Sequence, residues 1–220
     1  MPHGEQGIAC TAATIKISES PPDAEYPYYA KIKYLRATEW EEQLRQLHDD
    51  IREDFNTNQA DPYHDIDPDL SGRIKLGMDK VTSVYPEITT AAMFLKTDID
   101  ELMQHEHVKD ILDEELAVGN PKIRTFCKSV EPYCSTQPMV NAKGQQYEVW
   151  PLIESIKFEL DANILKHGIT LVDLPGANDS NEARGAIGAS FESKLHATCV
   201  VTNSDRAAAD TVVCYLASMQ

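Results

Sequence analysis

The sequence predicts an α/β fold that contains one sizeable core and a large, mainly helical insertion. Short segments rich in β-branched residues stand near the N-terminus and again in the last third of the chain. Between them, from about Thr38 to about Gly144, helical spacing of apolar residues prevails. The last third then alternates strand, loop and helix, which is typical of sheets covered by helices. A chain of 220 residues with 42% hydrophobic residues is long enough to bury such a core.

The N-terminal part predicts two strands. Ala12 to Ser18 is rich in β-branched residues, and Tyr28 to Leu35 alternates between apolar and polar positions. Ser20 to Pro27 contains three prolines and is therefore expected to be a loop. The simplest interpretation is a β-hairpin with a long connection.

A helix is predicted from about Glu39 to about Phe55. Thr38 and Glu41 have the spacing of a capping box at its start. Apolar side chains then recur every three or four residues on one face. These residues are Trp40, Leu44, Leu47, Ile51 and Phe55.

Two more helices are expected in the middle of the chain, after a polar loop at Asn56 to Ser71. They span Arg73 to Tyr85 and Asp98 to Leu116. His105 and His107 fall in the second helix. Two residues apart on a helix, they should point to different faces, which is poor spacing for a metal site and predicts surface side chains.

The last third predicts strand Leu152 to Leu160, strand Ile169 to Val172, a helix from about Asn181 to Leu195, strand Ala197 to Thr202 and a helix from about Ala207 to Ala217. The second of these strands is a continuous apolar run, as in strands buried on both faces. We expect it to be a central, buried, parallel strand, flanked by the strands that precede and follow it in the sequence.

Charge and composition exclude several classes of function. The formal charge is −16, and such a surface repels nucleic-acid phosphates and anionic lipid headgroups. The sequence contains no run of 18 apolar residues and no signal peptide, so we expect no membrane segment and a cytoplasmic or nuclear location. Five cysteines without a CxxC pair favour reduced thiols over a zinc site or a disulfide framework.

The most informative motif is Asp173, Leu174, Pro175 and Gly176, placed where a predicted buried strand ends. Ligands of α/β folds bind at the carboxyl ends of strands. An aspartate there can hold Mg²⁺, and a glycine lets its backbone N–H approach a phosphate. The alternative is a turn without function, because proline and glycine suit turns for conformational reasons alone.

Three segments together resemble the dynamin-like large GTPases, in particular the branch with fungal and nuclear members. They are WPLI at Trp150 to Ile153, HGITLVDLPGANDSNEARGA at His167 to Ala186, and ACTAATIKIS at Ala9 to Ser18. The second is similar to the region around switch II of that family, and the third to switch I with the strand after it. The resemblance implies that residues 1–220 form a partial dynamin-type GTPase domain, with part of a P-loop NTPase sheet and the helical insertion at about 38–144.

Carried over to this chain, the resemblance implies GTP and Mg²⁺ as ligands. Thr11 would be the switch I threonine that closes on Mg²⁺ and the terminal phosphate. Asp173 would hold the same Mg²⁺ through water, and the Gly176 N–H would reach the γ-phosphate, with Leu174 and Pro175 completing the switch II motif.

Two motifs of that family are missing from these residues. No GxxxxGK[ST] phosphate-binding loop precedes Thr11, and no [NT]KxD motif for guanine occurs. We therefore expect a fragment or a degenerate member of the family, inactive alone, with guanine-nucleotide binding weak or lost. An uncovered strand edge would favour self-association. The alternative is a non-catalytic interaction module that uses the apolar stripe of the helix at 39–55 as its binding surface.

Overall fold

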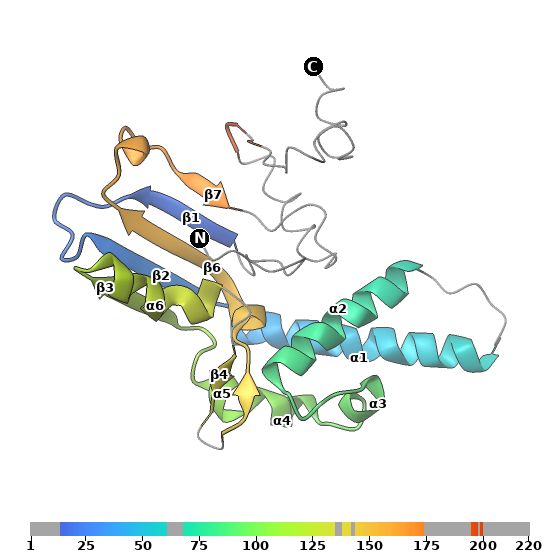
Figure 1. Cartoon of the computed structure of the whole chain (residues 1–220). Coiled ribbons are helices and arrows are strands. Elements are labelled where there is room, and N and C mark those ends of the chain that lie inside the picture. The colour runs from blue at the N-terminus through green and yellow to red at the C-terminus, as the bar shows by residue number, and fades with distance from the viewer. Residues whose placement is uncertain are drawn as a thin grey trace, which may run out of the picture.

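The computed structural model describes residues 14–60, 68–134, 138–141, 144–173, 195–197 and 199. Within them, a mixed five-stranded sheet lies beside a block of helices, which confirms the α/β class (Figure 1). The strand order across the sheet is β3 (Glu115–Asn120), β2 (Tyr28–Tyr34), β6 (Ile153–Leu160), β1 (Thr14–Glu19) and β7 (Leu171–Asp173).

The predicted hairpin between the first two strands is wrong, because β6 lies between β1 and β2. β6 pairs parallel with β1 and antiparallel with β2. Its Ile156 faces Ile15 on one side and Ile32 on the other, and all three are buried. An apolar row across three strands removes more surface from water than a two-stranded hairpin could.

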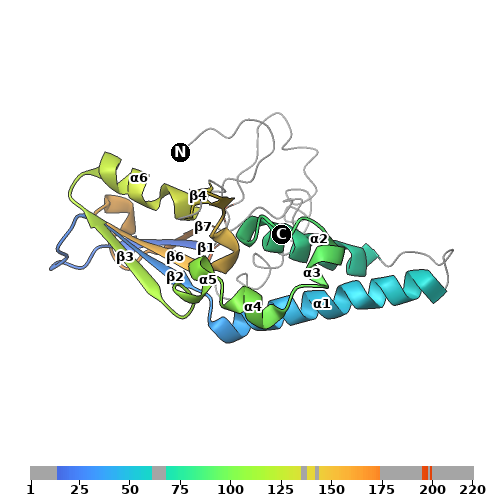
Figure 2. The ribbon, with the colours of Figure 1, turned by 90° about the horizontal axis from the view of Figure 1, so that it is seen from below.

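Helix α6 (Ile123–Cys134) covers one face of the sheet (Figure 2). Its buried residues are Phe126 and Val130. The ring of Phe126 lies 6.0 Å from that of Tyr28 and 5.9 Å from that of Phe158, between ring centroids. Aromatic pairs at this separation add to the apolar burial, so these contacts fix α6 on β2 and β6.

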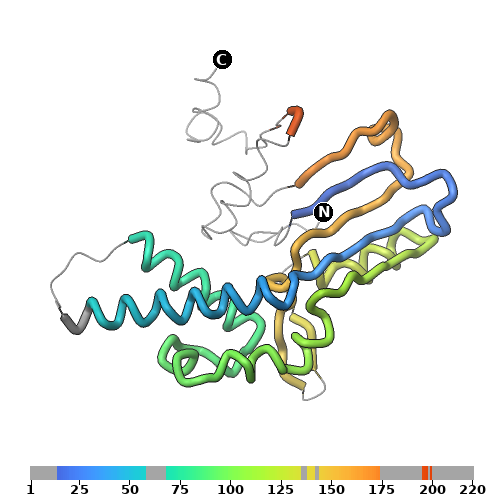
Figure 3. The backbone as a smooth tube through the Cα atoms, turned by 180° about the vertical axis from the view of Figure 1, so that it is seen from behind, coloured from blue at the N-terminus to red at the C-terminus, as the bar shows by residue number. Residues whose placement is uncertain are grey.

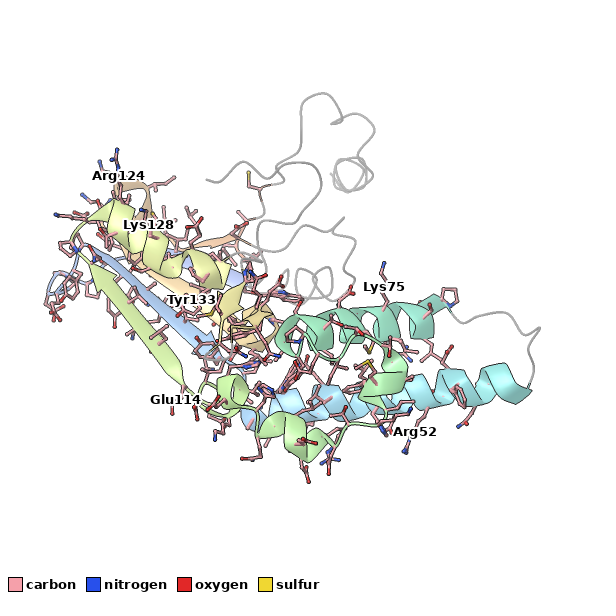
Figure 4. The ribbon with its side chains drawn as sticks, turned by 60° about the horizontal axis from the view of Figure 1, so that its bottom comes forward. Arg52, Lys75, Glu114, Arg124, Lys128 and Tyr133 are labelled. Carbon is pink, nitrogen blue, oxygen red and sulfur yellow. The ribbon has the colours of Figure 1, made fainter. Side chains whose placement is uncertain are left out.

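The two long helices form a hairpin that extends away from the sheet (Figure 3). They are α1 (Ala37–Ala60) and α2 (Pro68–Val84), close to the predicted helices. The exposed Arg52 of α1 and Lys75 of α2 point away from each other on opposite sides of the hairpin (Figure 4). The apolar stripe of α1 is buried between the helices, except that Phe55 is 56% exposed in the outer part of the hairpin.

The cap of α1 lies two residues earlier than predicted. The backbone N–H of Arg36 donates to Glu39 Oε2 at 3.0 Å, and the Arg36 guanidinium donates to Glu39 Oε1 at 2.7 Å. Arg36 is therefore the N-cap and Glu39 the third helical residue, which is the carboxylate half of a capping box.

The single helix predicted from Asp98 to Leu116 is also wrong. After the short α3 (Ala91–Phe94), this segment forms α4 (Ile99–Met103), α5 (Glu106–Lys109) and then β3. Asp113 turns the chain with a φ of 65°, and β3 then pairs with the edge of β2. Pairing with β2, and not the helical spacing of apolar residues, determines the structure of this segment, because Leu116 and Val118 can pack on the sheet core only from a strand.

The strand that precedes the Asp-Leu-Pro-Gly motif lies at one end of the sheet formed by the described strands. β7 pairs antiparallel with β1, and no second neighbour is found among the described residues. Ile169 and Leu171 are 47% and 41% exposed. β6 cannot flank β7, because both of its edges are occupied by β1 and β2. The elements predicted after Asn181 lie outside the described residues, apart from 195–197 and 199.

Four short elements complete the fold. They are β4 (Met139–Val140), β5 (Gln146–Tyr147), η1 (Trp150–Leu152) and η2 (Asn163–Leu165). β4 and β5 form a separate two-stranded hairpin beside the helical block. None of the helices described here is long and apolar enough to cross a membrane.

Candidate functional site

The candidate site lies at one end of the sheet, where β1 begins and β7 ends. Ile15, the second residue of β1, faces Asp173, the last residue of β7, in an antiparallel pair. Such partners have Cα atoms about 4.5–5.5 Å apart. The start of β1 and the end of β7 therefore lie at the same end of the sheet.

The predicted site residues stand close to this pair in the sequence. Asp173 is described and exposed, whereas Thr11, Leu174, Pro175 and Gly176 lie outside the described residues. Thr11 precedes the first residue of β1 by three positions in the sequence. The other three follow Asp173 directly.

The start of β1 is firmly anchored. Thr14 is 3% exposed and Ile15 is 8% exposed, and both pair in register with β6. Asp173 in contrast presents an exposed carboxylate at the rim of the sheet. Carboxylate and hydroxyl oxygens are ligands that Mg²⁺ accepts, commonly with water and phosphate oxygens in its remaining positions. No group of three or more metal-ligating side chains is found in the described part of the chain.

A second polar cluster was missed by sequence reasoning. His105 and His107 are half-buried side by side, with 3.1 Å between their Nδ1 atoms, and are not surface residues on opposite helix faces. The helix predicted through them is broken, and His105 is the N-cap of α5. His107 Nε2 lies 2.7 Å from the Val84 carbonyl oxygen. Burial lowers the pKa of His107, and the charge of His105 acts in the same direction.

This cluster continues into the core through Tyr85. Trp40 Nε1 donates to the Tyr85 hydroxyl, which donates in turn to the carbonyl oxygen of Leu102, each at 3.1 Å. The ring of Tyr85 is in edge contact with that of His105. The sequence predicts Trp40 in the apolar stripe of α1, but no local pattern indicates that its ring nitrogen bonds to Tyr85.

The apolar stripe of α1 is not a free binding surface. Trp40 and Leu44 are each 1% exposed, and Leu47 and Ile51 are 4% and 6% exposed. They belong to the hydrophobic core that α1 shares with its neighbours. Four of the five residues expected to form a binding surface are therefore part of the core.

The described residues thus form a mixed α/β sheet with an exposed aspartate where β7 ends. No protein-family model matches the chain. A human (Homo sapiens) protein, nuclear GTPase SLIP-GC, is 23% identical over 205 residues, which cover 90% of this chain and 24% of that protein. The chain thus spans about a quarter of the relative's length.

Proposed function

We propose that this chain is the switch-bearing part of a dynamin-type GTPase domain, which contacts GTP and Mg²⁺ at the end of the sheet where β1 begins and β7 ends. The observation that carries the proposal is the antiparallel pairing of Ile15 with Asp173. This pairing brings together two segments that are far apart in the sequence. Both are the segments that resemble switches, and the similarity to a GTPase covers most of the chain.

Each proposed role follows from the chemistry of the residue. The Thr11 hydroxyl would bind Mg²⁺ and close on the terminal phosphate, while the exposed Asp173 carboxylate would hold the water of the same ion. The backbone N–H of Gly176 would donate to a γ-phosphate oxygen, since no side chain blocks its approach. Mg²⁺ would neutralise charge on the transferring phosphoryl group.

These residues alone do not make a complete catalytic site. The phosphate loop and its lysine normally provide most contacts to the phosphates, and the 220 residues contain no GxxxxGK[ST] motif. Micromolar affinity requires about 8 kcal/mol, which two switches do not supply. We therefore infer that the 220 residues bind nucleotide with millimolar affinity at best and do not hydrolyse it.

Nuclear magnetic resonance titration of the 220-residue chain with Mg²⁺ and GTP tests the site. We expect chemical-shift changes confined to the residues around Thr14, Ile15 and Asp173, without saturation at micromolar nucleotide. ATP should give the same pattern, because no guanine-reading motif is present. Asp173→Ala and Thr11→Ala should each remove the changes.

Asp161→Ala is the matched control, since it removes an exposed carboxylate that follows β6 instead of β7. It should leave the nucleotide-induced changes intact. Changes that cluster elsewhere, or that persist in Asp173→Ala, would contradict the proposed site. A tight one-to-one complex would contradict the inference that these residues bind weakly.

A further inference from the structure

The two histidines lie at a junction between the helical block and the β4–β5 hairpin. His107 stacks on Tyr147 of β5, with ring centroids 4.1 Å apart, and bonds to Val84 at the end of α2. His105 touches Tyr85, whose hydroxyl connects α1 to α4. The two rings of α5 and its N-cap therefore contact the end of α2 and β5, and they reach α1 and α4 through Tyr85.

Hydrogen-bond chemistry fixes how many protons this arrangement can hold. The carbonyl oxygen of Val84 can only accept, so His107 carries a hydrogen on Nε2. The Nδ1 atoms of the two rings are 3.1 Å apart, and a single hydrogen between them completes one bond. With His107 neutral, His105 is the donor at that position.

The other side of His105 faces a carboxylate. Its Nε2 lies 3.4 Å from Glu87 Oε1, within ion-pair distance. The His105 ring is thus flanked by His107 at Nδ1 and by this carboxylate on its Nε2 side. Burial and the neighbouring His105 lower the pKa of His107, whereas Glu87 and Glu106 raise it.

A hydrogen on both Nδ1 atoms has no place in this geometry. It would put two N–H groups head to head at the 3.1 Å contact, between rings whose centroids are 4.4 Å apart. Neither ring would then offer the other an acceptor. The rings must then separate, and the stack of His107 on Tyr147 must break.

Tyr147 also forms one wall of a cleft of about 510 Å³ between the end of α2 and the β4–β5 hairpin. Asp79, Ser83 and Glu148 line the same cleft. Beside it, the Glu148 backbone N–H donates to the Ser83 carbonyl oxygen at 2.8 Å, which joins the hairpin to α2. Movement of Tyr147 would therefore change both the cleft and the hydrogen bond between Glu148 and Ser83.

We propose that the His105–His107 pair is a proton-operated joint that holds the β4–β5 hairpin against the helical block with one shared proton, and releases it when His107 accepts a second. Mild acidification is then the signal, since histidine is the side chain whose charge changes between pH 5 and 8. The joint is independent of the proposed nucleotide site, because it uses none of its residues.

Hydrogen exchange of the complete chain, corrected for the intrinsic pH dependence of exchange, tests the joint. At about pH 7.5 the Glu148 amide should be protected by its bond to Ser83, and at about pH 5.5 its protection should fall on the order of tenfold. His107→Gln should abolish this pH response, because glutamine keeps a donor for Val84 but does not titrate. His167→Asn is the control, since it removes an exposed histidine from a turn with a φ of 69°, which asparagine tolerates.

Ring-nitrogen spectra of the wild-type chain provide a readout that does not depend on the variant folding. At neutral pH they should show His107 protonated on Nε2 alone, and at acidic pH a doubly protonated His107 that appears together with the loss of Glu148 protection. A doubly protonated His107 with Glu148 still protected would overturn the proposal. So would an unchanged pH response in a folded His107→Gln, or a response that EDTA abolishes, which would indicate a metal ion between the rings.

Discussion

At the scale of single residues, Tyr85 is the polar centre of the helical block. It is fully buried, and its hydroxyl accepts from Trp40 and donates to Leu102. Burial raises its pKa well above the usual value, so it stays neutral at all physiological pH. The phenol thus satisfies two buried partners that have no access to water.

Tyr85→Phe should lower the free energy of unfolding by about 2–4 kcal/mol, because the Trp40 N–H and the Leu102 carbonyl are both left without their partner. Urea denaturation followed by circular dichroism measures the change. Tyr26→Phe is the control, since its ring packs beside Gly119 while its hydroxyl stays in solvent next to Glu25. Equal stability of Tyr85→Phe and wild type would show that this network contributes nothing.

The two cysteines of α6 should differ strongly in reactivity. Burial raises the pKa of Cys134 to about 11, while Cys127 is exposed on the same helix. Because the thiolate is the nucleophile, iodoacetamide at about pH 8 should alkylate Cys127 faster than Cys134, by roughly a hundredfold. Peptide mass spectrometry over time measures both rates. Similar rates in the folded chain would mean that Cys134 is accessible, and rates that converge in urea would confirm that folding causes the difference.

At the scale of elements, the sequence predicts those helices and strands whose apolar pattern is complete within one segment. The stripe of α1 and the apolar pattern of β6 are complete within their own segments, and both elements form close to the predicted positions. The pairing of β1 with β6 could not be predicted, since the two strands are far apart in the chain. A hairpin between the first two strands is the simpler expectation from sequence alone. β3 was missed for the same reason, because only the edge of β2 makes Glu115–Asn120 a strand.

The α1–α2 hairpin depends on a close approach at Gly77. A Cβ added there would lie 2.5 Å from Leu47 Cδ1, and Leu47 is only 4% exposed, so it has little room to move. Gly77→Ala should therefore destabilise the chain by about 1–2 kcal/mol, since overpacking exceeds the gain in helix propensity.

A double-mutant cycle separates this contact from general effects. Leu47→Ala alone should cost about 2–5 kcal/mol through the cavity that it leaves. In the Gly77→Ala background the same change should cost less, because the new methyl group fills part of that space. Denaturant titration of the four proteins gives the coupling energy. Strictly additive costs would mean that Gly77 and Leu47 are not in contact.

At the scale of the whole molecule, the sequence could indicate the candidate site only in part. The Asp-Leu-Pro-Gly motif is contiguous, so its chemistry is readable without a structure. The residue opposite the motif in the sheet cannot be found from the sequence, because only the strand register pairs Ile15 with Asp173. The histidine joint was hidden for a different reason. An apparently regular helix breaks at His105, which turns two separated side chains into a contacting pair.

The end of the described sheet at β7 predicts how the molecule behaves in solution. β7 has one partner, β1, among the described strands. Leu171 in β7 is 41% exposed, and Ile169 just before it is 47% exposed. Unpaired backbone groups beside exposed apolar side chains invite a strand from another copy. We therefore expect the chain to self-associate reversibly, although its charge of −16 opposes association at low ionic strength.

Leu171→Lys should shift the chain toward monomer, because a lysine on an edge strand disfavours pairing with a second copy. Sedimentation velocity at increasing protein concentration, at about 0.15 M salt, measures the change. Ile123→Lys is the matched control, since it adds the same charge at a 54% exposed apolar residue on α6, where no strand edge is available. It should leave the association unchanged. If both variants weaken association equally, net charge and not the edge of β7 controls self-association. A wild-type chain that is monomeric at all concentrations would show that the edge of β7 is protected.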